Sequence, residues 1–287
     1  MTYKTKISII TDSASDIPQN NNKNITVLPM TISFNDNNYE DGISLTPDEF
    51  YMKLIESDTL PKTSQVSPYA FEEAYKKVLE TSDKVVVITL SSKLSGTYQS
   101  ACIAAAGYED KIYVIDSENV TVGEQILIDY ALSLIQSDTD INEIISQLNT
   151  MKKRIRLVAL LDTLEYLKKG GRISGTAAFL GNVLNIKPVV AITDGEVSVL
   201  GKARGSKQGN NYLIQQVETY GGIDYTLPVL LGYTGSSTST TLIDKYIKDS
   251  SCLWEGKIPI PEVIQVGATI GTHIGPGGIT VAFFSQE

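Results

Sequence analysis

Apolar runs and amphipathic stretches alternate along the first half of the chain. Two helical patterns begin after Thr46 and Ser67, each a capping residue followed by proline, and two amphipathic helices fit between Val122 and Lys153. The short apolar runs that separate these helices predict strands at 7–11, 25–33, 85–90 and 112–117. Strands and helices in this order predict a parallel α/β sheet.

The second half of the chain shows a different pattern. Asp194-Gly195 lies between two strand-like runs and predicts the turn of a β-hairpin. Hairpin strands mixed with helices predict a second domain of α+β type, and the expected domains are 1–156 and 157–287, with an approximate boundary. The other expected elements are a segment that starts at Ser174, helices at 206–219 and 238–248, and strands at 227–233, 261–267 and 279–284.

Composition and charge restrict the class of protein. The chain has 287 residues, of which 42% are apolar and 20% charged, as is usual for a soluble globular protein. It has no apolar run near the roughly 18 residues of a membrane span, and its start lacks a signal-peptide pattern, so we expect a cytoplasmic protein. The net charge of −9 argues against nucleic acid, or an anionic membrane surface, as the main partner.

Basic residues are concentrated between Lys152 and Lys207. This segment holds 11 basic and 4 acidic residues, a net charge of +7 in a chain of net charge −9. It is either a set of solvated helix faces or a surface for an acidic protein or a phosphate. The two cysteines, Cys102 and Cys252, fit no metal or redox spacing, and we expect both to be small buried residues.

Residues 90–101, LSSKLSGTYQSA, place four serines and a threonine between a predicted strand and a predicted helix. Ligands gather at this edge of open α/β sheets, and the N–H groups at a helix start accept anions. We expect Ser95 to cap the helix and Gly96 to let the backbone approach a ligand. The alternative is a serine cap and a polar loop without a ligand. The segment lacks the G-x-S-x-G pattern, and a serine nucleophile needs a neighbouring base.

Catalytic and metal-binding motifs are few. His273 is the only histidine, and its glycine-rich surroundings predict a loop, in which it is structural or on the surface. A single histidine disfavours a zinc site, and no phosphate-loop or dinucleotide motif is present. The pairs Asp12/Asp16 and Asp116/Glu118 could coordinate a metal, but capping of turns explains them better.

Two further residues are candidates for facing a ligand. We expect residues 61–68 to form a loop, in which Ser67 caps a helix and Thr63 has no capping role. Arg172 follows a pair of glycines and is either a surface charge or a carboxylate clamp. The polar segment 34–42 predicts the tip of a hairpin.

Taken in order, eight motifs resemble those of the DegV family of bacterial fatty-acid-binding proteins. They are TDSASDIP (11–18), VLPMTISFNDNNYEDG (27–42), KTSQVSP (62–68), ITLSSKLSGTYQSA (88–101), IYVIDSENVTVG (112–123), LDTLEYLKKGGRIS (161–174), NIKPVVAITDGEV (185–197) and HIGPGG (273–278). Each motif alone is weak, but their order and their span of nearly the whole chain are specific.

The resemblance implies a two-domain DegV-like fold, with a parallel-sheet N-terminal domain, an α+β C-terminal domain and one long-chain fatty acid buried between them. It implies that Thr63, Ser95 and Gly96 bind the carboxylate. It also implies that Arg172 and His273 belong to a polar network around the head group.

The resemblance further implies a carrier without a cofactor, a metal or chemistry of its own. Such proteins present the acid to a separate fatty acid kinase, whose acyl phosphate product feeds phospholipid synthesis. Lys202, Arg204 and Lys207 stand where the family has a basic surface for the kinase, although GKARGSKQG matches that pattern only loosely. Transient membrane contact is compatible with this role.

The physical chemistry of a fatty acid agrees with the residues. A C16 tail contributes roughly 10 kcal/mol on burial, at about 0.8 kcal/mol per methylene, and hydroxyls with helix N–H groups can satisfy the head. Two alternatives remain open: an enzyme, such as a Ser/His hydrolase or a small-molecule kinase, or a binder of another anionic amphiphile.

Overall fold

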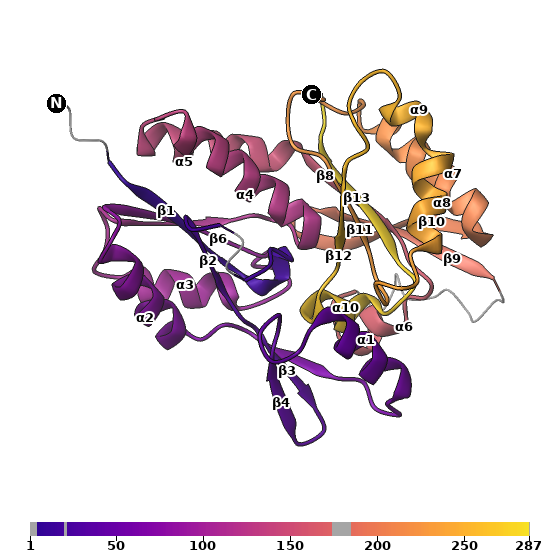
Figure 1. The fold of residues 1–287 in the computed structure, drawn as a ribbon, viewed down its shortest axis with the longest axis horizontal. Helices are drawn as coiled ribbons and strands as arrows, with labels where there is room; N and C mark the ends of the chain where they lie inside the picture. Colours follow the sequence, from indigo (N-terminus) through magenta and orange to yellow (C-terminus); the bar gives the residue numbers. More distant parts are fainter. Residues whose placement is uncertain (1–4, 20–21, 174–184, 287) are drawn as a thin grey trace.

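Two β-sheets with a helical layer between them form the centre of the molecule (Figure 1). The computed structural model describes residues 5–19, 22–173 and 185–286. The segment expected to start at Ser174 lies outside these residues. Helices also cover the outer face of each sheet, so that helical and sheet layers alternate across the molecule.

The first sheet is parallel, as predicted, and has the strand order β2-β1-β6-β7. Every residue of β1 is buried, as expected for a parallel strand covered on both faces. Helices α2 (Pro68–Leu79) and α3 (Thr97–Ala105) pack on this sheet, and Ser67 caps α2 as predicted. The strands are β1 (Ile7–Asp12), β2 (Ile25–Leu28), β6 (Lys84–Thr89) and β7 (Ile112–Asp116).

The second sheet is mixed and has the order β10-β9-β8-β13-β11-β12. Strands β11 and β12 run parallel, and the other neighbouring pairs are antiparallel. Asp194-Gly195 forms the predicted turn between β9 and β10, with both residues at positive φ. The strands are β8 (Ile155–Leu160), β9 (Ile186–Thr193), β10 (Glu196–Arg204), β11 (Leu230–Tyr233), β12 (Glu262–Gln265) and β13 (Ile279–Phe284).

Helix α7 (Gly205–Thr219) covers the outer face of the second sheet, and α8 (Thr241–Asp249) packs against α7. A short helix, α9 (Ser251–Trp254), follows. Its Cys252 is exposed and Cys102 is half-buried, so the prediction that both cysteines are buried is wrong. Cys102 lies on α3 and Cys252 on α9, at positions that these helices leave partly or fully open to solvent.

Helix α4 (Thr121–Gln136) lies between the two sheets and contacts β6, β8, β11 and β13. Its residues 121–128 are all buried, including the polar residues Thr121, Glu124 and Gln125. Helix α5 (Ile141–Met151) and a 3₁₀ turn (Lys152–Arg154) lead from it into β8. No helix in the described part of the chain is long and apolar enough to cross a membrane.

The predicted domain boundary after residue 156 falls inside β8, which begins at Ile155 and belongs wholly to the second sheet. Apolar side chains from both sheets, including Phe284 of β13, join one core around α4. The division into 1–156 and 157–287 therefore stays a prediction.

A small antiparallel sheet, β4-β3-β5, corrects two expectations. The run 25–33 is not one strand, because Pro29 lacks an N–H group and Met30 donates its own N–H to Ser13 Oγ (3.0 Å). The chain therefore leaves the parallel sheet after β2. The segment expected as a hairpin tip forms β4 (Asn37–Glu40), and the segment expected as a loop forms β5 (Lys62–Ser64). Both strands pair with β3 (Thr31–Phe34). Helix α1 (Pro47–Glu56) follows, with the predicted cap at Thr46.

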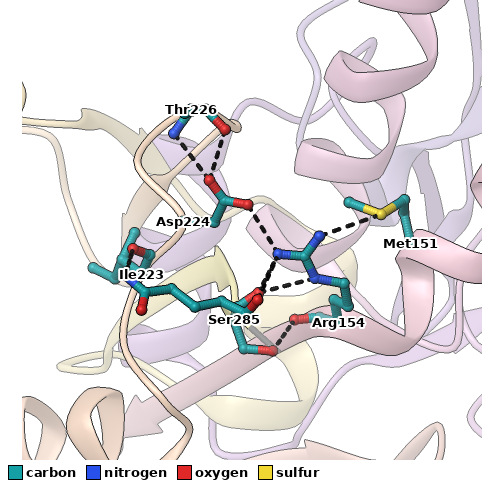
Figure 2. Close-up of polar contacts among 7 residues, drawn as sticks. Met151, Arg154, Ile223, Asp224, Thr226 and Ser285 are labelled. Carbon is teal, nitrogen blue, oxygen red and sulfur yellow. Dashed lines mark hydrogen bonds and ion pairs between the residues drawn. The ribbon is translucent and has the colours of Figure 1, made fainter.

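Arg154 joins the start of β8 to the end of β13 (Figure 2). Its Nε donates to the carbonyl oxygen of Ser285 (3.0 Å), and its Nη2 lies 2.9 Å from Asp224 Oδ2. Hydrogen bonds from Thr226, together with the Arg154 charge, lower the pKa of Asp224. The network holds the C-terminal strand in the centre of the second sheet.

Candidate functional site

A cavity of about 330 Å³ lies at the carboxyl end of the parallel sheet. Its lining includes residues that follow the ends of three parallel strands: Met30 after β2, Leu90 and Leu94 after β6, and Val120 after β7. The strand order reverses between β1 and β6, and ligand crevices form beyond such reversals in open α/β sheets. The cavity thus lies at the edge where the serine-rich segment was expected to meet a ligand.

All five head-group residues named from the sequence line this one cavity: Thr63, Ser95, Gly96, Arg172 and His273. They come from different elements, so the fold brings together segments more than 200 residues apart. The rest of the lining is mainly apolar, with three further polar side chains: Met30, Leu90, Leu94, Val120, Leu167, Val197, Ile270 and Ile274, with Ser64, Gln65 and Thr269.

His273 lies in the last turn of helix α10 (Ala268–Ile274), and the prediction that it lies on a loop is wrong. The glycines begin a turn directly after the helix, where Gly275 has a φ of +71°. His273 Nε2 lies 2.9 Å from Thr63 Oγ1, whereas its Nδ1 is buried without a partner among the described residues. Burial, with a smaller contribution from the Arg172 charge, lowers the pKa of His273 to about 4. The imidazole is therefore neutral near pH 7.

The His273 ring packs closely against Gly170, which has no side chain. It lies at the end of α6 (Glu165–Lys169) in a right-handed conformation that other residues adopt readily. A Cβ there would lie only 2.4 Å from His273 Nδ1. The glycine is therefore required by the close approach of the imidazole.

The serines of the segment 90–101 have separate tasks. Ser91 Oγ donates to the carbonyl of Gly195 (2.7 Å) and fastens the β9–β10 turn to the serine segment. Ser95 lines the cavity, and its Oγ lies 2.9 Å from Thr97 Oγ1. Ser95 is not the helix cap: Gly96 holds that position, because α3 begins at Thr97. The Ser95 hydroxyl still accepts the Thr97 N–H (3.3 Å).

Gln65 is a cavity residue that the sequence reasoning missed. Its side-chain amide donates to Ser100 Oγ (2.9 Å) and passes close over Gly96, where a Cβ would lie 2.1 Å from Gln65 Oε1. A larger residue at position 96 would therefore have to displace the Gln65 amide. The signal was present in the KTSQ motif, but nothing local showed that its glutamine meets the serine segment.

Arg172 joins two walls of the cavity. Its Nε donates to the carbonyl of Leu94 (3.2 Å) and its Nη1 to the carbonyl of Gly170 (2.6 Å). The side chain is partly buried and lines the cavity, so Arg172 is not a plain surface charge, and its role as a carboxylate clamp stays a prediction.

Two buried carboxyl groups hold the start of α10. Asp41 accepts the N–H groups of Ala268 (3.1 Å) and Thr269 (3.0 Å), and Asp16 accepts that of Gly267 (2.8 Å). Burial raises the pKa of Asp16 to about 8 and also raises that of Asp41. These carboxyls thereby position the helix that carries His273.

Asp12 and Glu124 lie in the same buried region. Asp12 accepts the N–H groups of Ala14 (3.0 Å) and Leu90 (2.9 Å), and burial raises its pKa to about 7. Thr11 donates to Glu124, whose other oxygen has no partner among the described residues. The described residues contain no group of three or more His, Cys, Asp or Glu side chains that could hold a metal ion. Asp12 and Asp116 accept backbone N–H groups in turns.

The basic residues Lys202, Arg204 and Lys207 lie on β10 and at the start of α7, with exposed side chains. None of them lines the cavity. Val197, nearer the start of β10, does line it, so the strand connects the cavity with this exposed basic segment.

Comparison with known proteins identifies the family to which this chain is similar. The DegV family of uncharacterised proteins matches residues 6–286. A DegV domain-containing protein of Caldanaerobacter subterraneus is 36% identical over 288 residues, which cover 98% of this chain and 99% of the relative.

Solved structures agree with this match. A fatty-acid-binding DegV family protein from Thermus thermophilus is 30% identical with a TM-score of 0.87, and the match covers 98% of this chain and 100% of that one. A stearic-acid-binding protein from Eubacterium ventriosum is 26% identical with a TM-score of 0.84 and 98% coverage of both chains. The predicted DegV-like α/β fold is confirmed, and this chain belongs to the DegV family.

Proposed function

We propose that this protein binds one long-chain fatty acid in the cavity and presents its carboxylate to a separate fatty acid kinase. One observation carries the proposal: Thr63, Ser95 and Gly96 line the same cavity as a set of apolar side chains. A ligand that fits this lining has a small polar end and a long apolar body. The fatty acids bound by the relatives from Thermus thermophilus and Eubacterium ventriosum have this form.

Neutral donors and one arginine would hold the head group. The hydroxyls of Thr63 and Ser95 can each donate a hydrogen bond, and the start of α3 adds backbone N–H groups and a positive partial charge. Arg172 supplies a full positive charge at the same cavity. A carboxylate there would be hydrogen-bonded, which removes most of the cost of burying its charge.

The tail would supply most of the affinity. Each methylene transferred from water to the apolar lining contributes about 0.8 kcal/mol, before the cost of ordering the chain. Leu90, Leu94 and Val120 offer such a lining from the parallel sheet, and Ile270 and Ile274 offer it from α10.

We propose that the protein performs no chemistry on the acid itself and needs no cofactor. The Ser/His hydrolase alternative lacks geometric support, because the hydrogen-bond partner of His273 Nε2 is Thr63, and Ser95 bonds to Thr97. The kinase, which we propose feeds phospholipid synthesis, would dock at Lys202, Arg204 and Lys207. This arrangement would place the protein in the cytoplasm, with the ligand held between the segments 1–156 and 157–287.

Native mass spectrometry of the purified protein tests the proposal. We expect a bound mass that matches one long-chain fatty acid, released on denaturation. Purified protein that carries no acid, and takes up none when acid is added, would refute fatty-acid binding. Formation of acyl phosphate from ATP and the acid by the isolated protein would instead refute the need for a kinase.

A further inference from the structure

Thr121, the first residue of helix α4, has a left-handed backbone. Its φ is +48°, whereas Val120 directly before it is extended, with a φ of −150°. A side chain that branches at Cβ clashes in this conformation, which glycine, asparagine and aspartate adopt far more readily. Such outliers persist only where the surrounding structure holds them, and they are concentrated at ligand-binding and switch regions.

Close packing fixes the start of α4. Thr121 is only 3% exposed, so its side chain is enclosed by the rest of the protein. The Asn119 side chain lies so near the helix that a Cβ on Gly123 would lie 2.0 Å from Asn119 Oδ1. Because α4 also contacts strands of both sheets, its first turn has little freedom to relax the backbone of Thr121.

The hydroxyl of Thr121 joins this helix start to a distant segment. Thr121 Oγ1 donates to Asp16 Oδ2 (2.5 Å), and Asp16 Oδ1 accepts the N–H of Gly267 (2.8 Å). A Cβ on Gly267 would lie 3.0 Å from Asp16 Oδ1, so the carboxylate packs directly against the glycine backbone. We call these three residues the Thr121–Asp16–Gly267 linkage. It connects the start of α4 with the residue that precedes α10.

Both ends of the linkage continue into the wall of the cavity. At one end, Val120 lines the cavity and is the chain neighbour of Thr121. At the other end, Gly267 begins the helix whose side chains line the same cavity, namely Thr269, Ile270, His273 and Ile274. Thr121 and Asp16 do not line the cavity themselves. The linkage therefore joins two parts of the wall from behind.

We propose that Thr121 and Asp16 are positioning residues for fatty-acid binding. This inference rests on the proposed function and gives a role in it to two residues that do not touch the ligand. The left-handed backbone of Thr121 directs Val120 into the cavity, and the hydrogen bonds through Asp16 hold Val120 in place relative to α10. Relaxation of the Thr121 backbone would move Val120 away from that position.

The alternative is that the linkage only stabilises the fold. A purely structural role would make the affinity for the acid follow the free energy of unfolding, whichever part of the protein is changed. A positioning role makes the affinity depend on the linkage itself. Two substitutions separate the hydroxyl from the shape: Thr121→Ser keeps the donor to Asp16, and Thr121→Val keeps the branched side chain without the donor.

Calorimetric titration with palmitate tests the proposal. We expect Thr121→Val to lose about fivefold or more in affinity, because the wall is no longer held, and Thr121→Ser to stay within about twofold of the unchanged protein. Val217→Ala is the control, because Val217 is buried in the core of the second sheet and does not line the cavity. It should lower the free energy of urea unfolding and leave the palmitate affinity within about twofold.

Each outcome decides the proposal. Unchanged affinity of Thr121→Val would overturn it, and so would a loss in Thr121→Ser or Val217→Ala as large as that in Thr121→Val. If Thr121→Val does not fold, Gly267→Ala decides, because the new methyl group displaces Asp16 from the other end of the linkage. Binding about threefold weaker would then support the proposal, and unchanged binding would overturn it. An unchanged protein that binds no palmitate would refute the proposed function and this inference together.

Discussion

Thr63 Oγ1 lies 2.9 Å from His273 Nε2, although 210 residues separate them in the chain. The contact joins the small three-stranded sheet to helix α10, and both residues line the cavity. A neutral imidazole there can accept a hydrogen bond from Thr63 or donate one to it, depending on its tautomer. Under the proposed function, this pair would lie at the head group of the bound acid.

Gly170→Ala should disturb this pair without straining the backbone. Gly170 has an ordinary right-handed conformation, but the new Cβ would lie 2.4 Å from His273 Nδ1. We expect a loss of about 1–3 kcal/mol in unfolding free energy, as for overpacking, together with weaker binding of a long-chain acid.

Gly171→Ala is the control for that variant. Gly171 has a φ of +70° and open space around it, so alanine there strains the backbone without touching His273. It should cost about 1 kcal/mol in urea unfolding and leave acid binding unchanged. Equal effects of the two variants on binding would contradict the role given to Gly170.

The stability of the protein should fall as the pH rises from about 4 to 8. Burial raises the pKa of Asp12 to about 7 and of Asp16 to about 8, from an ordinary value of 3.8, so the folded state holds more protons in this range than the unfolded state. The pKa of His273 is lowered to about 4, so this residue makes the stability rise with pH, but only between about pH 4 and its ordinary pKa of 6.5.

Between pH 6.5 and 8, the effect of Asp12 and Asp16 on stability is therefore not opposed by that of His273. Urea unfolding there should give a free energy that decreases with pH, and Asp16→Asn, which resembles the protonated acid, should flatten this slope. A slope that is flat in the unchanged protein, or unaltered by the substitution, would contradict the assignment.

The basic segment on β10 and α7 should affect phosphorylation but not binding. We expect replacement of Lys202, Arg204 and Lys207 with alanine to lower kcat/KM of a partner fatty acid kinase about tenfold or more, mainly by slowing association. Acid affinity should stay unchanged, because none of the three lines the cavity.

A matched triple variant controls for the loss of charge. Lys23, Lys77 and Lys111 are also exposed and do not line the cavity. Their replacement should leave the kinase reaction nearly unchanged, whereas equal effects of the two triple variants would show that only net charge matters.

The sequence predicted the elements whose signals are local. Long apolar runs identified β1, β6 and β7, and capping residues identified the starts of α1 and α2. The position of Ser95 at a ligand-binding edge followed from the order of strands and helices. Thr63, Arg172 and His273 needed the family resemblance as well, because no local pattern relates these three segments.

The failures have physical causes. Residues 25–33 have the composition of one strand, but Pro29 lacks a donor, and the Met30 N–H bonds to Ser13 in a distant segment. His273 was expected on a loop because glycines follow it, whereas the start of its helix is fixed by Asp41 and Asp16, more than 200 residues earlier. The contact of Gln65 with Ser100 could not be predicted either, because no local pattern relates residues that lie 35 positions apart.

We propose that hydroxyls from two separate segments bind the acidic end of an apolar chain. Calorimetric titration with a long-chain acid and with the alcohol of the same length measures what these hydroxyls contribute. The unchanged protein and Ser92→Ala, whose residue lies in the same segment but outside the cavity lining, should prefer the acid by about tenfold or more. Thr63→Ala/Ser95→Ala should lose that preference, and a double variant that keeps it in full would contradict the account.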